Sequence, residues 1–266
     1  MPGDHELDCC AAAGTGPSGR LLAIGDIHGG YRAFAALLAT LRPDRDDLVI
    51  TLGDYIDRGP RSREVMNRLI RLQKEAALIA LRGNHEEMIL EWRQDNSALF
   101  GVWLANGGLA TLQSYGWGQG PATWGAGDAA LLLAGALADP AGISRLIPRA
   151  HWLFWEGCRD WFETEDYIFV HGGVEPDLDM ELQSPERLHW LRFDPAQRGH
   201  KSGKKVICGH APRLSGHPED LGHTLCIDTY LYGGQWLTCL DLTNGEYYQA
   251  NNLGEVRVSL VGAGPP

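Results

Sequence analysis

Three polar, glycine-containing motifs, each placed directly after a short apolar run, constrain the fold of this chain more than any other feature. The apolar runs cover 21–24, 48–52 and 77–81, and the motifs that follow them are GDIHG, GDYIDRG and GNHE. Short apolar runs of this kind are typical of buried strands. The segments between them, 31–41 and 61–75, are expected to be helices, and the second has apolar residues at helical spacing. The order strand, loop, helix is therefore repeated.

Strands that alternate with helices predict parallel pairing, which brings the three motifs together. Ligands of such sheets bind in the crevice beyond the carboxyl ends of the strands. Two more strand-like runs, 167–170 and 206–208, are followed by His171 and by Gly209-His210. A single Asp or His after a strand is usually a turn or hydrogen-bonded residue, but five such strand ends together favour one shared site. Oxygen and imidazole ligands suit Mn, Fe, Zn or a similar divalent ion.

The five motifs, in this order, resemble the signature of the phosphoprotein phosphatase family of calcineurin-like metallophosphoesterases, particularly its bacterial and phage-type serine/threonine protein phosphatases. The resemblance spans about 21–250. It implies an α/β fold, a four-layer α/β/β/α sandwich of two mixed sheets. It also implies two divalent metal ions per chain, for which we expect manganese, with iron or zinc as alternatives.

The resemblance assigns every metal-ligand position to a residue of this chain. One ion is assigned to Asp26, His28 and Asp54, and the other to Asp54, Asn84, His171 and His210. Two ions about 3.5 to 4 Å apart can share a hydroxide and clamp the phosphoryl oxygens during in-line attack. The expected reaction is therefore direct transfer of the phosphoryl group to water.

Four further residues match the substrate and acid positions of the family. Arg58 and Arg192 resemble its phosphate-binding arginines, since a guanidinium can hold two phosphate oxygens at once. His85, oriented by Asp57, is the expected general acid that protonates the departing alkoxide. Glu86 and Asp228 are expected to act only as supporting residues.

Three functions are compatible with these residues. We favour a protein phosphatase that acts on phosphoserine and phosphothreonine, with phosphotyrosine as a further substrate. The alternatives are a symmetrical dinucleoside tetraphosphate hydrolase and a non-catalytic binding module with the same fold. The filled set of ligands argues against the binding module, and the presence of Asp57 favours the protein phosphatase, because the tetraphosphatase relatives usually lack an acid there. The expected partner is a phosphorylated protein or peptide, and no regulatory partner can be identified.

Composition limits the remaining choices. The net charge of -11 argues against extended nucleic-acid binding, which depends on Lys and Arg. The six cysteines show no disulfide pattern, which fits a reducing compartment. No apolar stretch has the length of a membrane span, and 1–20 lack signal-peptide features. We therefore expect a cytoplasmic protein that contacts no membrane.

We expect a single metallophosphatase domain over 20–258, between a disordered N-terminal tail (1–19) and a C-terminal tail (259–266). Within the domain, the region of about 95–161 is rich in tryptophan and looks helical. It is expected to form either a small separate core or a wall that shapes substrate access. Short strands in the last third, separated by glycine turns, predict a second and more antiparallel sheet.

Overall fold

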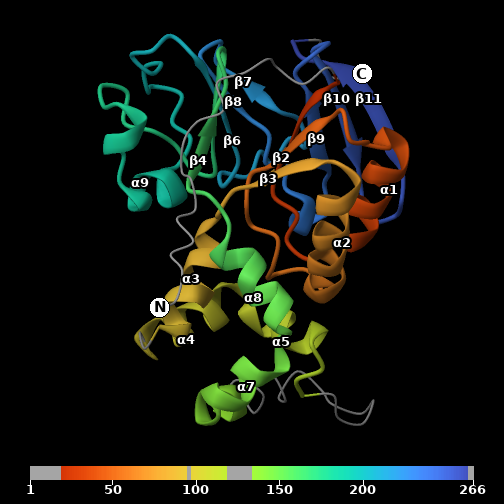
Figure 1. Ribbon diagram of the computed structural model, residues 1–266, viewed down its shortest axis with the longest axis vertical. Helices are drawn as coiled ribbons and strands as arrows, with labels where there is room; N and C mark the ends of the chain where they lie inside the picture. Colours follow the sequence, from red (N-terminus) through yellow and green to blue (C-terminus); the bar gives the residue numbers. More distant parts are fainter. Residues whose placement is uncertain (1–18, 95–96, 119–133, 263–266) are drawn as a thin grey trace, which may run out of the picture.

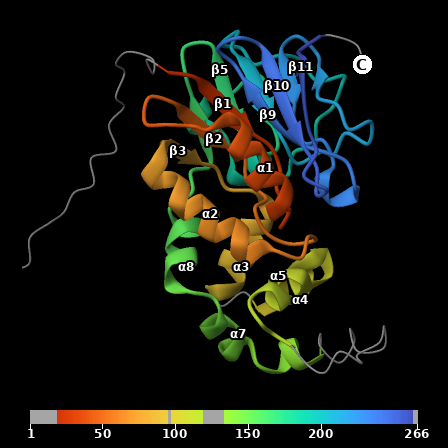
Figure 2. The same ribbon diagram turned by 90° about the vertical axis from the view of Figure 1, so that its right-hand side faces the viewer.

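The computed structural model describes residues 19–94, 97–118 and 134–262, which form two sheets with helices outside them (Figures 1 and 2). The strands are β1 (Leu21–Ile24), β2 (Leu48–Thr51), β3 (Ala77–Ala80), β4 (Trp161–Glu163), β5 (Tyr167–Val170), β6 (Lys205–Cys208), β7 (Glu219–Asp220), β8 (Thr224–Cys226), β9 (Leu237–Asp241), β10 (Glu246–Ala250) and β11 (Val256–Leu260). The α-helices with defined bounds are α1 (Tyr31–Leu41), α2 (Ser62–Glu75), α3 (Asn84–Arg93), α4 (Ser97–Trp103), α5 (Leu109–Ser114), α7 (Pro140–Leu146), α8 (Arg149–Glu156) and α9 (Pro185–Trp190). A π-helical turn, η1 (Leu104–Gly108), joins α4 to α5, and η2 (Met180–Leu182) and η3 (Leu231–Gly233) are 3₁₀ turns.

The first sheet has the strand order β11-β10-β9-β1-β2-β3. Strands β1, β2 and β3 are parallel, as the alternation of strands and helices predicts. Strand β9 pairs with β1 in the antiparallel sense, and β10 and β11 continue antiparallel from it. The prediction that the C-terminal strands build the second sheet is therefore wrong for these strands, because β9 pairs with the free edge of β1.

The second sheet has the order β4-β5-β6-β8-β7. Its centre, β5, β6 and β8, is parallel, while β4 and β7 are antiparallel edges. Both sheets are thus mixed. Strands β4 and β5 form the hairpin expected around 164–166.

Side-chain alternation along the strands explains how the layers pack. In β1, Leu22 and Ile24 face the helices, whereas Ala23 faces the second sheet. In β5, Phe169 points into the layer between the sheets, and Ile168 points outward toward Leu188 of α9. Successive strand residues point to opposite faces, so each sheet contributes to two apolar layers. The result is the predicted four-layer α/β/β/α sandwich, with α1 and α2 on one side and α9 on the other.

The tryptophan-rich region continues the helix-side core instead of forming a separate one. In Figure 1 its helices α4, α5, α7 and α8 lie below the sheets, next to α3. Trp92 stacks on Trp103 with ring centroids 5.9 Å apart, and Trp152 packs edge-on against Trp155 at 5.1 Å. These four rings are buried in the same cluster as the side chains of α1 and α2. The expectation of a small separate core is therefore wrong.

The predicted domain boundaries differ from the structure at one end. The C-terminal boundary at 258 falls inside β11, whose five residues all pair with β10, so 259–260 are not a tail. Val256, Val258 and Leu260 alternate as in a strand, but they are the exposed side chains of an edge strand. At the other end, Gly19 donates its backbone N–H to Asp46 O, and the rest of the predicted N-terminal tail lies outside the described residues.

The structure also bears on two expectations from the sequence, which concern the cysteines and membrane-spanning segments. Cys158, Cys208, Cys226 and Cys239 are buried free thiols, in agreement with the absence of a disulfide pattern. Within the described part of the chain, no helix combines the length and the apolar character that crossing a bilayer requires.

Candidate metal centre and active site

The loops that follow β1, β2, β5 and β6 meet at the carboxyl ends of both sheets. His28 N donates to Asp54 O at 2.8 Å, and Gly209 N donates to His171 O at 2.8 Å, so neighbouring loops are bonded to one another. Residues with left-handed backbone conformations are concentrated here, namely His28, Asp54, Asp57, Arg58 and His210. Such conformations are unfavourable for non-glycine residues and gather at functional sites. The predicted site residues are thus held in place by a locally strained backbone.

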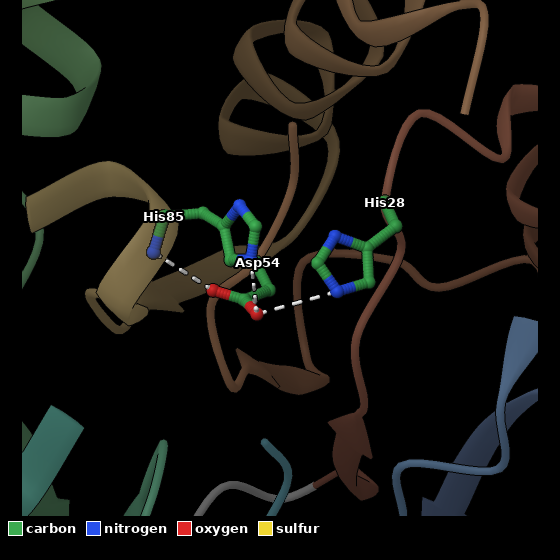
Figure 3. Close-up of side chains that lie close together, drawn as sticks. All are labelled: His28, Asp54 and His85. Carbon is green, nitrogen blue, oxygen red and sulfur yellow. Dashed lines mark hydrogen bonds and ion pairs between the residues drawn. The ribbon is translucent and has the colours of Figure 1, made fainter. Parts of the chain in front are cut away.

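One group of candidate ligands lies on the β1 and β2 side of this site. Asp54 Oδ2 is 3.3 Å from His28 Nε2 and 3.8 Å from His85 Nε2. Figure 3 shows the three side chains converging, with His85 on α3 and the other two on loops. These three residues form one of the two groups of the described residues that could hold a metal ion.

The second group lies on the other side of the same carboxylate. Asp54 Oδ1 is 3.4 Å from His171 Nε2, and His210 completes the group. Asn84 Oδ1 lies between the two imidazoles, 3.1 Å from His171 Nε2 and 3.1 Å from His210 Nδ1. The two oxygens of Asp54 therefore face different histidines, which is the arrangement that a ligand shared by two ions needs.

The hydrogen bonds of the imidazoles test whether this site fits a cation. His28 Nδ1 lies 2.9 Å from Ile56 O, and His171 Nδ1 lies 2.8 Å from Leu52 O. A backbone carbonyl only accepts, so each Nδ1 carries the proton and each neutral ring presents the lone pair of Nε2 to the site. Burial lowers the pKa of His171 to about 3 although Asp54 opposes this, so the ring is neutral.

In the second group, the neutral ring of His171 therefore presents an acceptor toward other acceptors. The lone pair of His171 Nε2 faces the oxygens of Asn84 and Asp54 at 3.1 and 3.4 Å. Acceptors held this close repel one another unless a positive charge lies among them. Neutral imidazoles oriented through Nδ1 are also the usual form of metal-binding histidine. The residues present consequently fit a divalent cation.

Asp54 is the electrostatic centre of the site. Burial alone would raise the pKa of its carboxyl, but the positive charge that the imidazoles of His171, His85 and His28 gain at acidic pH outweighs burial and holds the pKa well below the usual range. Space beside the carboxylate is tight, since a Cβ on Gly83 would lie 2.2 Å from Asp54 Oδ1. Glycine at this position thus lets α3 begin against the carboxylate.

Asp26 has a different placement from the other predicted ligands. Its carboxylate accepts the backbone N–H of His210 at 3.0 Å, and it belongs to neither ligand group of the described residues. Burial, together with the charges of Asp228 and Asp54, raises its pKa well above the usual value. Asp26 therefore holds the His210 loop in this structure, and its role as a ligand remains a prediction.

His85 and Asp57 form a buried pair at the edge of the site. His85 Nδ1 lies 2.6 Å from Asp57 Oδ2, and both side chains are fully buried. Burial would lower the pKa of His85, but the charge of Asp54 and the bond to Asp57 raise it overall. His85 Nε2 has no hydrogen-bond partner in the described part of the chain. This nitrogen thus lies buried without a hydrogen-bond partner among the described residues, 3.8 Å from Asp54 Oδ2.

Glu86 supports the loop that carries Asp54. Its carboxylate accepts the backbone N–H groups of Asp54, Tyr55 and Gly83 at 2.8, 2.9 and 3.1 Å. Burial and the charge of Asp54 raise its pKa to about 8. These contacts agree with the supporting role expected for Glu86.

The two predicted phosphate-binding arginines are both exposed, but only one contacts a candidate ligand. Arg58 Nη1 is 3.0 Å from His28 Nε2, and its guanidinium lies 4.2 Å above the ring of Tyr232. Arg192 follows α9. Burial is the main cause that lowers the pKa of His210, and the charge of Arg192 lowers it further. Arg58 thus contacts a candidate ligand directly, whereas Arg192 acts on His210 through its charge.

Three aromatic or hydroxyl residues around the site have no counterpart in the sequence-based predictions. Tyr232 covers Arg58, Trp103 donates its indole N–H to Asp57, and Thr111 donates its hydroxyl to Asp57. They come from η3, α4 and α5, far along the chain from the motifs. No motif or spacing in the sequence gave these residues a role.

Comparison with known proteins identifies the family. The model of the calcineurin-like phosphoesterases matches residues 19–235, which is most of the chain. The fold and the clustered donors define a metallophosphoesterase of the α/β sandwich type. This chain belongs to the calcineurin-like phosphoesterase family.

Individual relatives show two kinds of phosphoesterase. The chain is 40% identical over 89 residues to serine/threonine-protein phosphatase 1 of Salmonella typhimurium, which covers 32% of this chain and 37% of that protein. It is 43% identical over 72 residues to a symmetrical bis(5'-nucleosyl)-tetraphosphatase of Acidovorax ebreus, covering 26% of this chain and 25% of that protein. The alignments thus span between 25% and 37% of the length of these curated relatives.

A solved structure extends the similarity in fold to nearly the whole chain. The cold-active protein-tyrosine phosphatase of a Shewanella species superposes with a TM-score of 0.57 over 90% of this chain and 80% of that one. The two sequences are 15% identical. This similarity concerns the fold alone.

Proposed function

We propose that this chain is a dinuclear metal-dependent phosphomonoesterase that removes phosphate from phosphoserine and phosphothreonine side chains of proteins. The observation that supports this most is the buried His85–Asp57 pair beside the candidate metal centre, with a bond of 2.6 Å and with no hydrogen-bond partner for Nε2 among the described residues. Serine and threonine leave as strongly basic alkoxides, which need a proton as the P–O bond breaks. A nucleoside diphosphate leaves as a weakly basic phosphate and needs none.

The candidate ligands would hold two divalent ions, for which manganese is our first choice, with iron or zinc as alternatives. One ion would be held by Asp26, His28 and Asp54, and the other by Asp54, Asn84, His171 and His210. When bound, two such ions supply an activated water molecule and neutralise charge on the phosphoryl oxygens.

The residues of the chain would carry out the remaining steps. Arg58 and Arg192 hold phosphoryl oxygens, since both are exposed, Arg58 contacts His28 and the charge of Arg192 acts on His210. As the bond from phosphorus to the side-chain oxygen breaks, the proton on His85 Nε2 passes to that oxygen. Asp57 keeps Nδ1 of the same ring protonated and fixes its orientation.

The distribution of lysines also favours a peptide over a polyphosphate. Lys201, Lys204 and Lys205 form the lysine cluster nearest the motifs in sequence, and each is paired with a carboxylate, at 2.7, 2.8 and 2.8 Å. Lys205 begins β6, whereas His210 follows the opposite end of that strand. These lysines are therefore unsuited to bind a chain of four phosphates at the metal centre.

Side-by-side kinetics test the substrate class. With Mn²⁺-loaded protein, we expect kcat/KM to be higher on phosphoserine and phosphothreonine peptides than on diadenosine tetraphosphate. Asp57→Ala should reduce the peptide value more than the dinucleotide value, because only the peptide reaction needs the acid. A clear preference for the dinucleotide, released as two nucleoside diphosphates, would contradict the protein phosphatase function and leave the metal site intact.

Arg58 offers a second test of the same site. Arg58→Ala should lower kcat by about 10² to 10³, since removal of one preorganised contact to a transferring group has effects of that size. The side chain is exposed, so the melting temperature should change little. Arg61→Ala is a matched control, because Arg61 pairs with Glu64 on α2. Equal activity of the two variants would remove Arg58 from the phosphate site.

A further inference from the structure

Two of the side chains that bind the carboxylate of Asp57 lie outside the phosphatase motifs. Its Oδ2 accepts the indole N–H of Trp103 at 2.8 Å in addition to the 2.6 Å bond from His85, and its Oδ1 accepts the hydroxyl of Thr111 at 2.7 Å. All four side chains have 0% exposure. Three donors thus fix both oxygens of this carboxylate in a site without water access.

We propose that Trp103 and Thr111 are positioning residues that hold the Asp57 carboxylate, and through it the His85 ring, in the orientation that general-acid transfer requires. This inference rests on the proposed function of His85 as the acid. It assigns to the tryptophan-rich region a direct connection to catalysis, in place of a role limited to packing or substrate access.

The backbone of Asp57 explains why it needs such support. Its φ of 71° is in the left-handed region, which is unfavourable for aspartate. Its backbone N–H is held by Thr111 Oγ1 at 2.8 Å and by Ser62 Oγ at 3.2 Å. Thr111 therefore binds both the backbone and the carboxylate of the same residue, which fixes Asp57 from two directions. A displacement of about 1 Å at a catalytic group can lower the rate about 10²-fold.

The helical segment that carries Trp103 and Thr111 is shaped to approach the site closely. The π-helical turn η1 lies between these two residues, and such turns are common at functional sites. A Cβ on Gly108 would lie 2.6 Å from the Trp103 ring, so only glycine lets the turn pack against the indole. Gly107 O accepts the backbone N–H of Arg58 at 3.2 Å. The same turn thus contacts Arg58 of the motif loop and packs against Trp103, which binds Asp57.

Proton NMR of the full chain tests the positioning directly. The His85 Nδ1–H is buried in a short bond to a carboxylate, so it should exchange slowly and resonate far downfield. In protein loaded with diamagnetic Zn²⁺, Trp103→Phe and Thr111→Val should shift or broaden this resonance, because each removes one donor and keeps most of the side-chain volume. In the same two variants, the ratio of kcat on a phosphoserine peptide to kcat on p-nitrophenyl phosphate should fall about 10-fold.

Two control variants separate positioning from packing. Trp152→Phe changes a buried tryptophan of the same cluster whose N–H donates to Ser144 O at 3.3 Å, and it should leave the resonance and the ratio unchanged. Thr111→Ser restores the hydroxyl and should return both readouts toward those of the unmodified chain. If Trp103→Phe does not fold, the Thr111→Val and Thr111→Ser pair decides the question alone.

An unchanged His85 resonance in both Trp103→Phe and Thr111→Val would overturn the proposal. So would a shift of equal size in Trp152→Phe, since it would show a general packing effect. Failure of the proposed function can be distinguished from failure of this inference, because it is measured in a different variant, His85→Ala. If that variant keeps the peptide to p-nitrophenyl phosphate ratio of the unmodified chain, His85 is not the acid, whatever the resonance shows.

Discussion

Asp54→Asn is expected to remove both metal ions and nearly all activity. Its carboxylate faces His28 Nε2 at 3.3 Å with one oxygen and His171 Nε2 at 3.4 Å with the other, so it would contribute to both metal positions. An amide has no negative charge and offers only one oxygen. Loss of a single preorganised electrostatic contact lowers kcat about 10² to 10³-fold, and a residue that serves both ions should exceed this, with a loss of at least about 10³-fold.

The measurement combines metal analysis with hydrolysis of an aryl phosphate. The unmodified chain should hold two divalent ions, lose activity in excess chelator and regain it with Mn²⁺, because the ligands must be assembled around the ion before reaction. Asp54→Asn should bind less than one ion per chain and should not be rescued by Mn²⁺. The His171→Ala variant should lose mainly one ion, which distinguishes a shared ligand from one that serves a single position.

Asp47→Asn is the matched control for the loss of a buried aspartate. Asp47 is 4% exposed and pairs with Arg20 at 2.6 Å, and it precedes β2, whereas Asp54 follows it. The two residues therefore lie at opposite ends of one strand. Asp47→Asn should lower stability but keep both ions. Full activity of the unmodified chain in excess chelator, with no metal bound, would rule out the two-metal mechanism.

The sequence was sufficient to predict those parts of the fold in which a local pattern of residues is repeated. Apolar runs followed by glycine motifs predicted β1, β2 and β3 and their parallel pairing, because the apolar period and the order of elements both depend on nearby residues. The placement of β9 was not predictable in this way. Its residues read equally well as a strand of either sheet, and only the free edge of β1 decides the pairing.

The candidate site likewise contains residues whose placement the sequence predicts and residues whose placement it does not. Motif residues such as Asp54, Asn84 and His210 come together as expected, since each follows a strand whose end lies at the same edge. Trp103 and Thr111 reach Asp57 from 46 and 54 residues away, through helices whose packing depends on the whole aromatic cluster. No local spacing encodes such a contact. His85 is a third case, because the sequence places it beside the candidate ligand Asn84, and the structure places it 3.8 Å from Asp54 as well.

The position of His85 allows two chemical roles that one experiment can separate. A histidine whose Nδ1 is bonded to a carboxylate is the usual arrangement of a metal ligand, and Nε2 could take that role beside Asp54 and His28. The same arrangement suits a general acid, and the raised pKa of His85 favours the protonated ring that an acid needs. A ligand must give up this proton before it binds the ion. The two roles therefore predict opposite results for metal content.

His85→Ala is expected to lower kcat on phosphoserine peptides by about 10² to 10⁴ while both metal ions stay bound. The loss on p-nitrophenyl phosphate should be much smaller, because nitrophenolate leaves as a stable anion without a proton. His200→Ala is the control, since His200 is a buried histidine that bonds to Leu178 O at 2.7 Å and to Ser202, away from the ligand groups. It should leave the ratio of the two substrates unchanged. Loss of one ion from His85→Ala, with an equal fall in kcat on both substrates, would instead make His85 a ligand and leave the alkoxide to be protonated by solvent.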